Sequence, residues 1–233
     1  MTGNSTHPAT VLVSGGLDSA VLLHYVAKKL TYHPLHALSF HYGQRHAREL
    51  DMARAQVQAL PKVVDHRIVD ISFFSRLVGT ATALVADGTD VPDLDSLSQN
   101  QLRQPPTYVP NRNMILLSLA AAYAESKNCN AIFYGAQQQD RYGYWDCTPD
   151  FVERLNRVLA LNRRKPVTVY APFARMKKEE EIRLGLELGV DFGKTWSCYR
   201  GGSTPCGTCP TCVERRRAFE EAGAADPLVA DEP

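Results

Sequence analysis

One stretch near the start decides the fold of this chain: Val11-Leu12-Val13-Ser14-Gly15-Gly16-Leu17-Asp18-Ser19. The apolar, β-branched run over 10–13 predicts a buried parallel strand, and the helical spacing over 20–30 predicts a helix just after the two glycines. Glycines let the backbone approach an anion closely, and the N–H groups of a first helical turn point at that anion. The stretch therefore predicts a phosphate-binding turn. A plain strand-to-helix turn capped by Ser14 or Asp18 is the alternative.

Strand-like and helix-like segments alternate outward from this turn. Strands are predicted over 35–40, 63–69, 131–134 and 167–170, and helices over 49–60, 114–126, 149–162, 178–188 and 213–222. This alternation is typical of an α/β fold with a parallel sheet. Residues 87–107 break the pattern with polar and turn-forming residues, and we interpret them as a lid, with a passive surface insertion as the alternative. We expect residues 1–9 to be disordered and residues 224–233 to form a loose tail.

The composition narrows the class of protein. The 233 residues include 26 Lys and Arg against 25 Asp and Glu, which gives a formal net charge of +1. This near balance argues against a general nucleic-acid coat or a polybasic membrane binder. No apolar run approaches the roughly 18 residues of a membrane span, and the start of the chain lacks the features of a signal peptide. We therefore expect a cytoplasmic protein with no membrane partner.

Four of the six cysteines form a cluster with the pattern C-x7-C-x2-C-x2-C. A reducing compartment argues against disulfides and favours metal binding. Four thiolates at this spacing suit tetrahedral zinc, which would be structural because no coordination site stays open. An iron–sulfur cluster and two disulfides are the alternatives. The predicted ligands are Cys198, Cys206, Cys209 and Cys212.

Polar clusters follow the predicted strands, at the edge where parallel sheets bind ligands. The cluster after the second strand contains Tyr42, Gln44 and Arg45. The guanidinium of Arg45 can donate two parallel hydrogen bonds to a phosphate or a carboxylate. A solvated loop fits this cluster equally well. Arg112 stands at the start of the helix predicted over 114–126, where it suits a phosphate or carboxylate, and Asn113 is a candidate cap.

The segment 135–151, after the fourth strand, mixes aromatic and polar groups. Such a mix suits a planar ligand that stacks on rings and forms hydrogen bonds at its edges. Asp140 and Asp146 are candidates to accept N–H groups from a guanine-like edge, and Tyr144 lies between them. The arginines 215–217 beside the cysteines suggest nucleic-acid binding, but an exposed helical face balanced by nearby glutamates agrees better with the net charge.

These motifs together resemble one family. The turn SGGLDS lacks the lysine of a Walker A loop and is similar to the PP-loop motif SGGxDS of the ATP pyrophosphatases. Together with FHYGQRHARE (40–49), VPNRN (109–113), GYWDC (143–147) and CGTCPTCVERRRAF (206–219), it resembles the QueC family of the queuosine and archaeosine pathways over residues 10–223. The resemblance implies a Rossmann-like PP-loop (adenine nucleotide alpha hydrolase-like) domain over 10–190, a small zinc-binding helical region over 191–223, and a homodimer.

The resemblance also implies a reaction. ATP would adenylylate the carboxylate of 7-carboxy-7-deazaguanine, ammonia would displace AMP to give an amide, and a second adenylylation would lead to the nitrile. The implied cofactors are ATP, Mg²⁺ and Zn²⁺. The residues implied to hold the ATP phosphates are Ser14, Gly15, Gly16, Leu17, Asp18 and Ser19. The implied catalytic residues are Asp18, Arg45, Arg112 and Lys178, with Lys177 as a competitor for Lys178. The implied substrate-binding residues are Tyr42, Gln44, Asn113, Asp140, Tyr144 and Asp146.

Two departures from the family pattern keep alternatives open. The family commonly reads YPDCRPEF, whereas this chain has Trp145 for the first Pro and Thr148 for the Arg. An alternative function is therefore that of a QueC-like ligase of antiviral CBASS operons, which couples the same activated acid to the N-terminal amine of a protein and stops at the amide. A PP-loop tRNA thiolase and a zinc-ribbon nucleic-acid module without catalysis are further alternatives.

Overall fold

The centre of the molecule is a five-stranded parallel sheet, seen in a computed structural model that describes residues 7–45, 48–85, 88–138 and 143–229. The strand order is β3-β2-β1-β4-β5. The strands are β1 (Ala9–Leu12), β2 (Leu35–His41), β3 (Val63–Asp70), β4 (Ala131–Phe133) and β5 (Thr168–Tyr170). The predicted α/β class and each predicted strand are confirmed.

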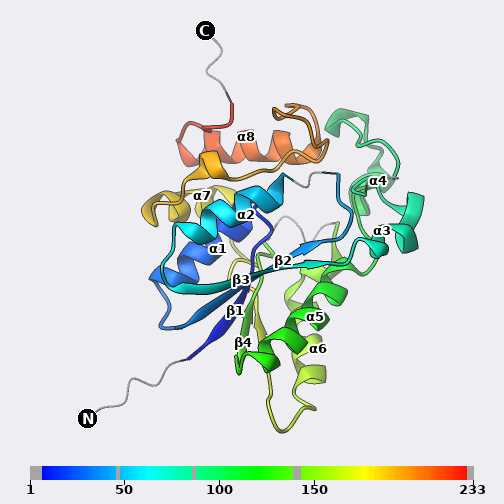
Figure 1. Cartoon of the computed structure of the whole chain (residues 1–233). Helices are drawn as coiled ribbons and strands as arrows, with labels where there is room; N and C mark the ends of the chain where they lie inside the picture. The colour runs from blue at the N-terminus through cyan, green and yellow to red at the C-terminus, as the bar shows by residue number, and fades with distance from the viewer. Residues whose placement is uncertain (1–6, 46–47, 86–87, 139–142, 230–233) are drawn as a thin grey trace.

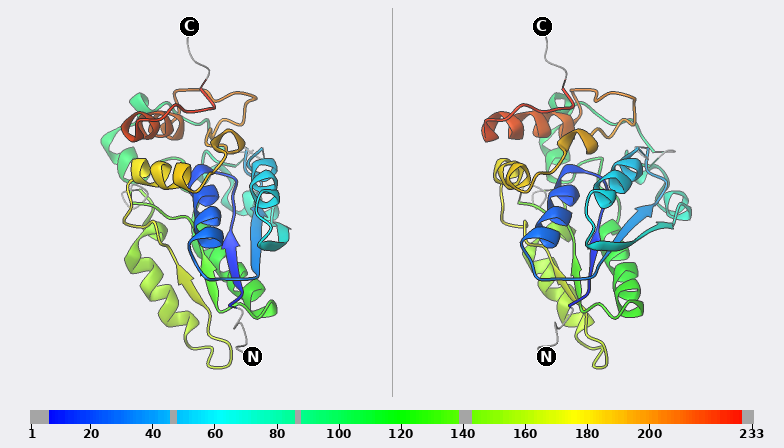
Figure 2. Two further views of the ribbon diagram at one scale, coloured as in Figure 1. Left: turned by 90° about the vertical axis from the view of Figure 1, so that its left-hand side faces the viewer. Right: turned by 60° about the vertical axis from the view of Figure 1, so that its left-hand side comes forward.

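Helices cover both faces of the sheet (Figures 1 and 2). One layer consists of α1 (Leu17–Lys28), α2 (Glu49–Gln58), α7 (Lys178–Glu187) and α8 (Pro210–Ala222). The other layer consists of α5 (Arg112–Ser126) and α6 (Pro149–Leu159). The strand order reverses between β1 and β4, and in such sheets ligands bind beyond the carboxyl ends of the strands at this point.

Short elements complete the chain. They are α3 (Phe73–Val78), α4 (Gln99–Arg103) and the 3₁₀ turns η1 (Gly79–Ala81), η2 (Leu94–Ser96), η4 (Trp145–Cys147) and η5 (Phe192–Lys194). The segment predicted as a lid contains η2 and α4, and α3 was not predicted. We call residues 88–107 the strap, because Leu94 N donates to Thr208 O at 3.1 Å and so ties this segment to the cysteine-bearing loop.

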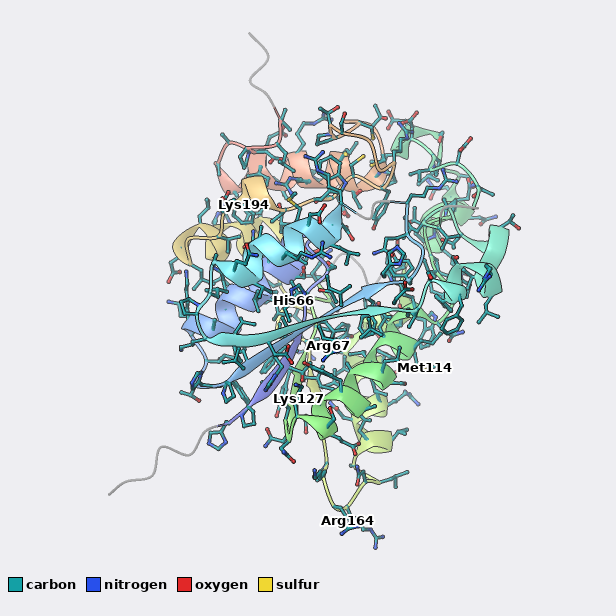
Figure 3. All side chains as sticks on the ribbon, viewed as in Figure 1. His66, Arg67, Met114, Lys127, Arg164 and Lys194 are labelled. Atoms are coloured by element: carbon teal, nitrogen blue, oxygen red, sulfur yellow. The ribbon has the colours of Figure 1, made fainter. Side chains whose placement is uncertain are left out.

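Several predicted boundaries are corrected by the structure. β1 begins at Ala9, inside the stretch expected to be disordered, and Ala9 is buried. α8 begins at Pro210 and not at residue 213, since proline in a first helical turn loses no hydrogen bond. As predicted, α6 starts with Pro149 in its first turn, and Gly189 follows the end of α7 with a positive φ. The turn from α6 to β5, which carries Arg164, lies at the far end of the molecule from α8 (Figure 3).

The tail expected to be loose is packed in its first part. Asp226 accepts hydrogen bonds from Arg215 Nε at 2.7 Å and Nη2 at 2.9 Å, and both side chains are only 5% exposed. This ion pair also corrects the expectation that Arg215 lies on an exposed helical face, although Arg216 and Arg217 do lie there. Residues 230–233 lie outside the described ranges. Within those ranges, no helix has the length and apolar character to cross a membrane.

Candidate active site

A cavity of about 580 Å³ opens beyond the carboxyl ends of β1, β2 and β4. Its walls come from the turn between β1 and α1, the start of α5, the strap, and the segment around the first cysteine of the cluster. Of the predicted site residues, those that line it are Ser14, Gly16, Leu17, Asp18, Ser19, Tyr42, Gln44, Arg112, Asn113, Tyr144 and Lys178. The cavity therefore brings together polar groups that follow three different strands.

The turn between β1 and α1 requires glycine at one position. Gly15 has φ +92°, and a Cβ on it would lie 1.9 Å from the carbonyl oxygen of Glu49 at the start of α2. The Ser19 hydroxyl accepts hydrogen bonds of 3.1 Å from the N–H groups of Ser14 and Gly15. It also donates one of 3.0 Å to Gly16 O, so a single side chain holds the turn in shape.

The first turn of α1 presents backbone donors to the cavity. The first hydrogen bond at this end of the helix runs from Ala20 N to Gly16 O at 3.1 Å, so the N–H groups of residues 17–19 precede it. The cap residue Gly16 has no side chain to satisfy them. Three such donors at the positive end of a helix dipole form an anion-binding site of the kind that holds phosphate.

Asp18 and Lys178 form an ion pair at this end of the cavity. Lys178 Nζ lies 3.1 Å from Asp18 Oδ1 and 3.2 Å from Oδ2. Lys177, the competing lysine, is not among the residues that line the cavity, is 61% exposed and has its Nζ 3.7 Å from Glu179 Oε1. Of the two lysines, only Lys178 contacts the phosphate turn. Its ion pair with Asp18 places one cation and one carboxylate beside that turn.

Another part of the cavity wall is aromatic and carries an arginine. Arg112 Nη1 donates to the Tyr42 hydroxyl at 3.4 Å, and its guanidinium lies 5.8 Å from the centre of that ring. Burial raises the pKa of Tyr42, so its hydroxyl stays neutral, although the charge on Arg112 opposes this shift. The other rings of this chamber belong to Tyr134, Tyr144 and Tyr199. Tyr144 is held by a 2.7 Å hydrogen bond between its hydroxyl and Thr107 Oγ1 of the strap.

Two predicted site residues have other surroundings than expected, and a third lies outside the described residues. Arg45 donates to the carbonyl oxygens of Val85, Gly88 and Thr89, so it ties the base of the strap instead of lining the cavity. Asp146 is 2% exposed, and its Oδ2 accepts the Asn113 N–H at 3.1 Å, so it caps α5 and does not face the cavity. Burial raises the pKa of Asp146. Asp140 lies outside the described residues.

Gln44 lines the cavity, but both polar atoms of its side-chain amide form hydrogen bonds with the backbone of its own loop. Its Oε1 accepts the Tyr42 N–H at 2.8 Å, and its Nε2 donates to Phe40 O at 3.2 Å. Glu49, Trp196 and Tyr199 also line the cavity and were not predicted. Each lies within or beside a recognised motif, but no periodicity or spacing distinguished it from its neighbours.

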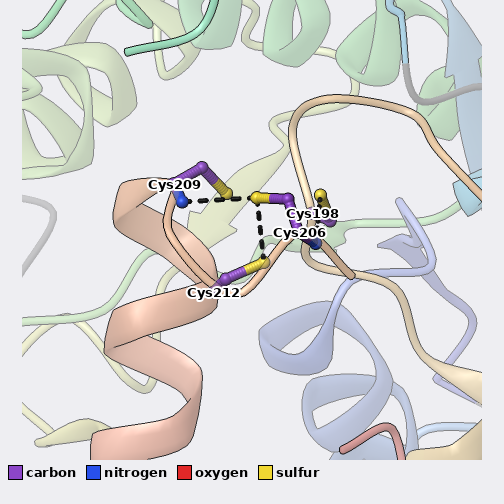
Figure 4. Close-up of side chains that lie close together, drawn as sticks. All are labelled: Cys198, Cys206, Cys209 and Cys212. Atoms are coloured by element: carbon purple, nitrogen blue, oxygen red, sulfur yellow. Dashed lines mark hydrogen bonds between the residues drawn. The ribbon is translucent and has the colours of Figure 1, made fainter. Parts of the chain in front are cut away.

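The four clustered cysteines can hold a metal ion. Their Sγ atoms lie within 4.8 Å of one another, and Cys206 and Cys212 are 3.9 Å apart (Figure 4). Tetrahedral zinc with bonds of about 2.3 Å places sulfur atoms about 3.8 Å apart, so the arrangement fits. Cys209 N donates to Cys206 Sγ at 3.3 Å, and the thiols of Cys198 and Cys212 lower the pKa of Cys209. All six cysteines lie in the described ranges and none forms a disulfide.

Comparison with known proteins identifies close relatives. The sequence pattern of the family described as "Queuosine biosynthesis protein QueC" matches residues 8–223. A 7-cyano-7-deazaguanine synthase of Alteromonas mediterranea is 44% identical over 94% of this chain and 96% of its own length. One of Caldicellulosiruptor saccharolyticus is 43% identical over 94% of both chains. The U34-tRNA thiolase NcsA of Methanococcus maripaludis, solved with its [4Fe-4S] cluster, matches 93% of this chain and 65% of its own with a TM-score of 0.50. At 16% identity that likeness concerns the fold alone.

Proposed function

The chain belongs to the QueC family of queuosine biosynthesis proteins, and on that premise we propose that it is an ATP-dependent 7-cyano-7-deazaguanine synthase. One observation carries the proposal: a single cavity joins a phosphate-binding turn to an aromatic chamber that contains an arginine. An enzyme that activates a planar acid with ATP needs these two ends side by side, because the carboxylate must reach the α-phosphate in the correct orientation.

The phosphate end would bind ATP. The N–H groups of residues 17–19 hold the phosphates, and the Lys178 ammonium balances the charge that develops on the leaving pyrophosphate. Asp18 offers a carboxylate oxygen at this place, which is the ligand type that Mg²⁺ prefers. Mg²⁺, when bound there, supplies a Lewis acid that neutralises phosphate charge.

The aromatic end would bind 7-carboxy-7-deazaguanine, whose flat rings suit the tyrosine walls. Its carboxylate attacks the α-phosphate of ATP, which gives an acyl adenylate and pyrophosphate. Ammonia attacks the acyl carbon and AMP leaves, which gives the amide. The amide oxygen then takes a second adenylyl group from ATP, and loss of AMP with two protons gives the nitrile. Leu94 and Leu97 of the strap lie over the cavity, and we assign the strap the role of a lid that limits the access of water to the adenylates.

The cysteine cluster has a structural role in this proposal. Zinc fits its four sulfur ligands, and with four protein ligands no position remains for substrate. The proposal includes self-association into a homodimer, which light scattering on the purified protein tests directly.

A direct assay tests the proposed function. The protein is mixed with ATP, Mg²⁺, ammonia and 7-carboxy-7-deazaguanine, and the products are followed by mass spectrometry. We expect the amide and then the nitrile, with AMP and pyrophosphate released in both steps. Asp18→Asn, which keeps the size of the side chain but removes its charge, is expected to abolish turnover. The proposal fails if the wild-type protein forms no AMP under any of these conditions.

A second candidate function is favoured by aromatic residues beside Tyr144, which lines the cavity. Trp145, which stands where the family commonly has proline, is 46% exposed and donates to the Tyr108 hydroxyl at 2.8 Å. An exposed aromatic surface next to a cavity residue suits a larger amine donor, such as the N-terminus of a protein. The same assay distinguishes the two functions, because the second requires AMP formation only after a peptide amine is added and no nitrile at any time.

A further inference from the structure

Arg112 is a half-buried cation in the cavity that forms no salt bridge with any acidic residue in the described ranges. Its two hydrogen bonds are both long, 3.4 Å from Nε to Asn113 Oδ1 and 3.4 Å from Nη1 to the Tyr42 hydroxyl. No carboxylate of the described residues lies within ion-pair distance of it. A guanidinium has five N–H donors, so three of them, including both on Nη2, meet no acceptor in the described part of the chain. Withdrawing such a charge from water is costly without an anion, so this end of the cavity is arranged for an anionic ligand.

Arg112 reaches the cavity from a different helix than the one that follows the phosphate turn. Arg112 is the first residue of α5, whereas the phosphate turn leads into α1 on the opposite face of the sheet (Figure 1). The phosphate end already has its own cation, Lys178. Around Arg112 lie the rings of Tyr42 and Tyr199 and the thiol of Cys147, so its ligand combines a planar apolar body with a negative group. A planar guanidinium pairs with a carboxylate through two parallel hydrogen bonds, which fits an aromatic acid.

A second residue fixes the turn from which Arg112 projects. The cap residue of α5, Asn111, has φ +54° and makes no side-chain cap hydrogen bond. Asp146, from another segment, replaces that cap by accepting the Asn113 N–H at 3.1 Å. Asn113 in turn donates from Nδ2 to Cys147 Sγ at 3.2 Å and accepts from Arg112 Nε. Asp146 therefore orients Arg112 through Asn113; the charge of Arg112 opposes the rise in the pKa of Asp146, but the two described side chains form no salt bridge.

We propose that Arg112 binds the carboxylate of the acid substrate before it is adenylylated, and that Asp146 is the positioning residue that aims it. The proposal rests on the proposed function and makes it more specific. Because the later amide carries no charge, the Arg112 pair distinguishes the acid from the amide, and the enzyme selects the acid for the first activation. Asp146 acts through α5 and does not touch the base, in contrast to the interpretation from the sequence.

Binding of two matched ligands tests the proposal. Calorimetry measures the affinity of the full chain for 7-carboxy-7-deazaguanine and for its uncharged amide, with Mg²⁺ and α,β-methylene-ATP present. We expect the wild type to prefer the acid. Arg112→Gln is expected to weaken acid binding about 10- to 100-fold, the loss of a charge-assisted pair, and to change amide binding less than about threefold. Arg112→Lys should restore part of the preference, and Asp146→Asn should lower it about 3- to 10-fold by loosening the first turn.

The outcomes separate the inference from the proposed function. A wild type that binds neither ligand contradicts the proposed function. A wild type that binds the acid, with an acid-to-amide ratio that Arg112→Gln leaves unchanged, overturns the inference alone. Thermal melting checks that each variant folds. If Arg112→Gln does not fold, an unchanged ratio in both Arg112→Lys and Asp146→Asn overturns the inference equally well.

Discussion

The backbone N–H of Trp196 donates a hydrogen bond of 3.0 Å to the carbonyl oxygen of Gly15. This contact joins the segment before the cysteine cluster directly to the phosphate turn. The Trp196 side chain is buried together with Val91 of the strap and with Cys198, Cys209 and Cys212. The cysteine cluster, the strap and the phosphate turn therefore share one set of contacts, and a change in one is expected to reach the other two.

Removal of the metal from the cysteine cluster is expected to weaken nucleotide binding. Without its ion, the loop that carries Cys198 is no longer held, and the Trp196–Gly15 hydrogen bond loses its support. We expect about one zinc per chain by metal analysis, and about a tenfold loss of affinity for α,β-methylene-ATP after chelation or in Cys209→Ser. Cys129→Ala, outside the cluster, is the control. Unchanged affinity in the metal-free protein would show that the two regions are independent, and iron in place of zinc would refute the zinc assignment.

Gly15→Ala is expected to prevent the turn from closing. The new Cβ would lie 1.9 Å from Glu49 O, and the residue would also keep a positive φ. Gly223→Ala is a matched control, since Gly223 has φ +72° and open space around it. In the control, the free energy of unfolding should decrease by only about 1–2 kcal/mol, the cost of placing alanine at a positive φ. Urea unfolding should give a clearly larger loss for Gly15→Ala, together with loss of nucleotide binding; equal losses in the two variants would refute the close approach.

Lys178→Met is expected to slow turnover about 100-fold or more with little effect on folding. The ammonium that faces the phosphate turn is lost, while the aliphatic part of the side chain is kept. Lys177→Met is the control one residue away, because Lys177 is exposed and does not line the cavity. Steady-state rates of AMP formation measure both. If Lys177→Met were the more damaging change, the assignment of the lysine would be reversed.

Arg200→Ala is expected to release the strap. Arg200 Nη2 donates to Val91 O at 3.1 Å and to Asp93 Oδ1 at 2.8 Å, and Nη1 donates to Thr208 Oγ1 at 2.9 Å. Limited proteolysis should cut within 88–104 several times faster, and the KM for the acid should rise while the melting temperature changes by a few degrees at most. Arg216→Ala, on the exposed face of α8, should change neither quantity. If the two variants were cleaved within 88–104 at the same rate, Arg200 would not be the residue that holds the strap.

Stability is expected to fall as the pH drops below about 6.5, in part because of His24. Burial, followed by the charge of Lys28, lowers the pKa of His24, whose Nε2 lies 3.2 Å from Gln56 Oε1. Above the unfolded pKa both states hold a neutral ring, and this contribution is fully present. As the pH falls toward the lowered folded pKa, only the unfolded chain takes up the proton, so the free energy of unfolding decreases by up to about 1.4 kcal/mol per pH unit.

Urea unfolding at pH 7.5, 6.0 and 5.0 measures this dependence. His24→Gln is expected to be less stable at pH 7.5 but to show a shallower decline toward pH 5.0. An equal slope in the variant would show that other groups carry the pH dependence. Burial also lowers the pKa values of His36 and His66, so both act in the same direction and a residual slope is expected.

Local signals in the sequence were sufficient to predict the strands of the parallel sheet and the main helices between them. Each parallel strand was predicted from a short apolar run, and the element after β1 was predicted from its two glycines, because these signals act between neighbouring residues. Predictions failed where a distant partner decided the outcome. Arg215 appeared to be an exposed helical residue because its partner, Asp226, comes after the helix has ended.

For the candidate site, too, local sequence signals predicted one part and contacts between distant segments decided the other. The sequence by itself determined the motifs: the glycine turn, the polar strand ends and the four cysteines, each of which is a pattern of close neighbours along the chain. Only the tertiary structure decided which side chains face the cavity. It turned Asp146 inward to cap α5, bound Arg45 to the strap and chose Lys178 over Lys177, because the direction of a side chain depends on packing and hydrogen bonds between distant segments.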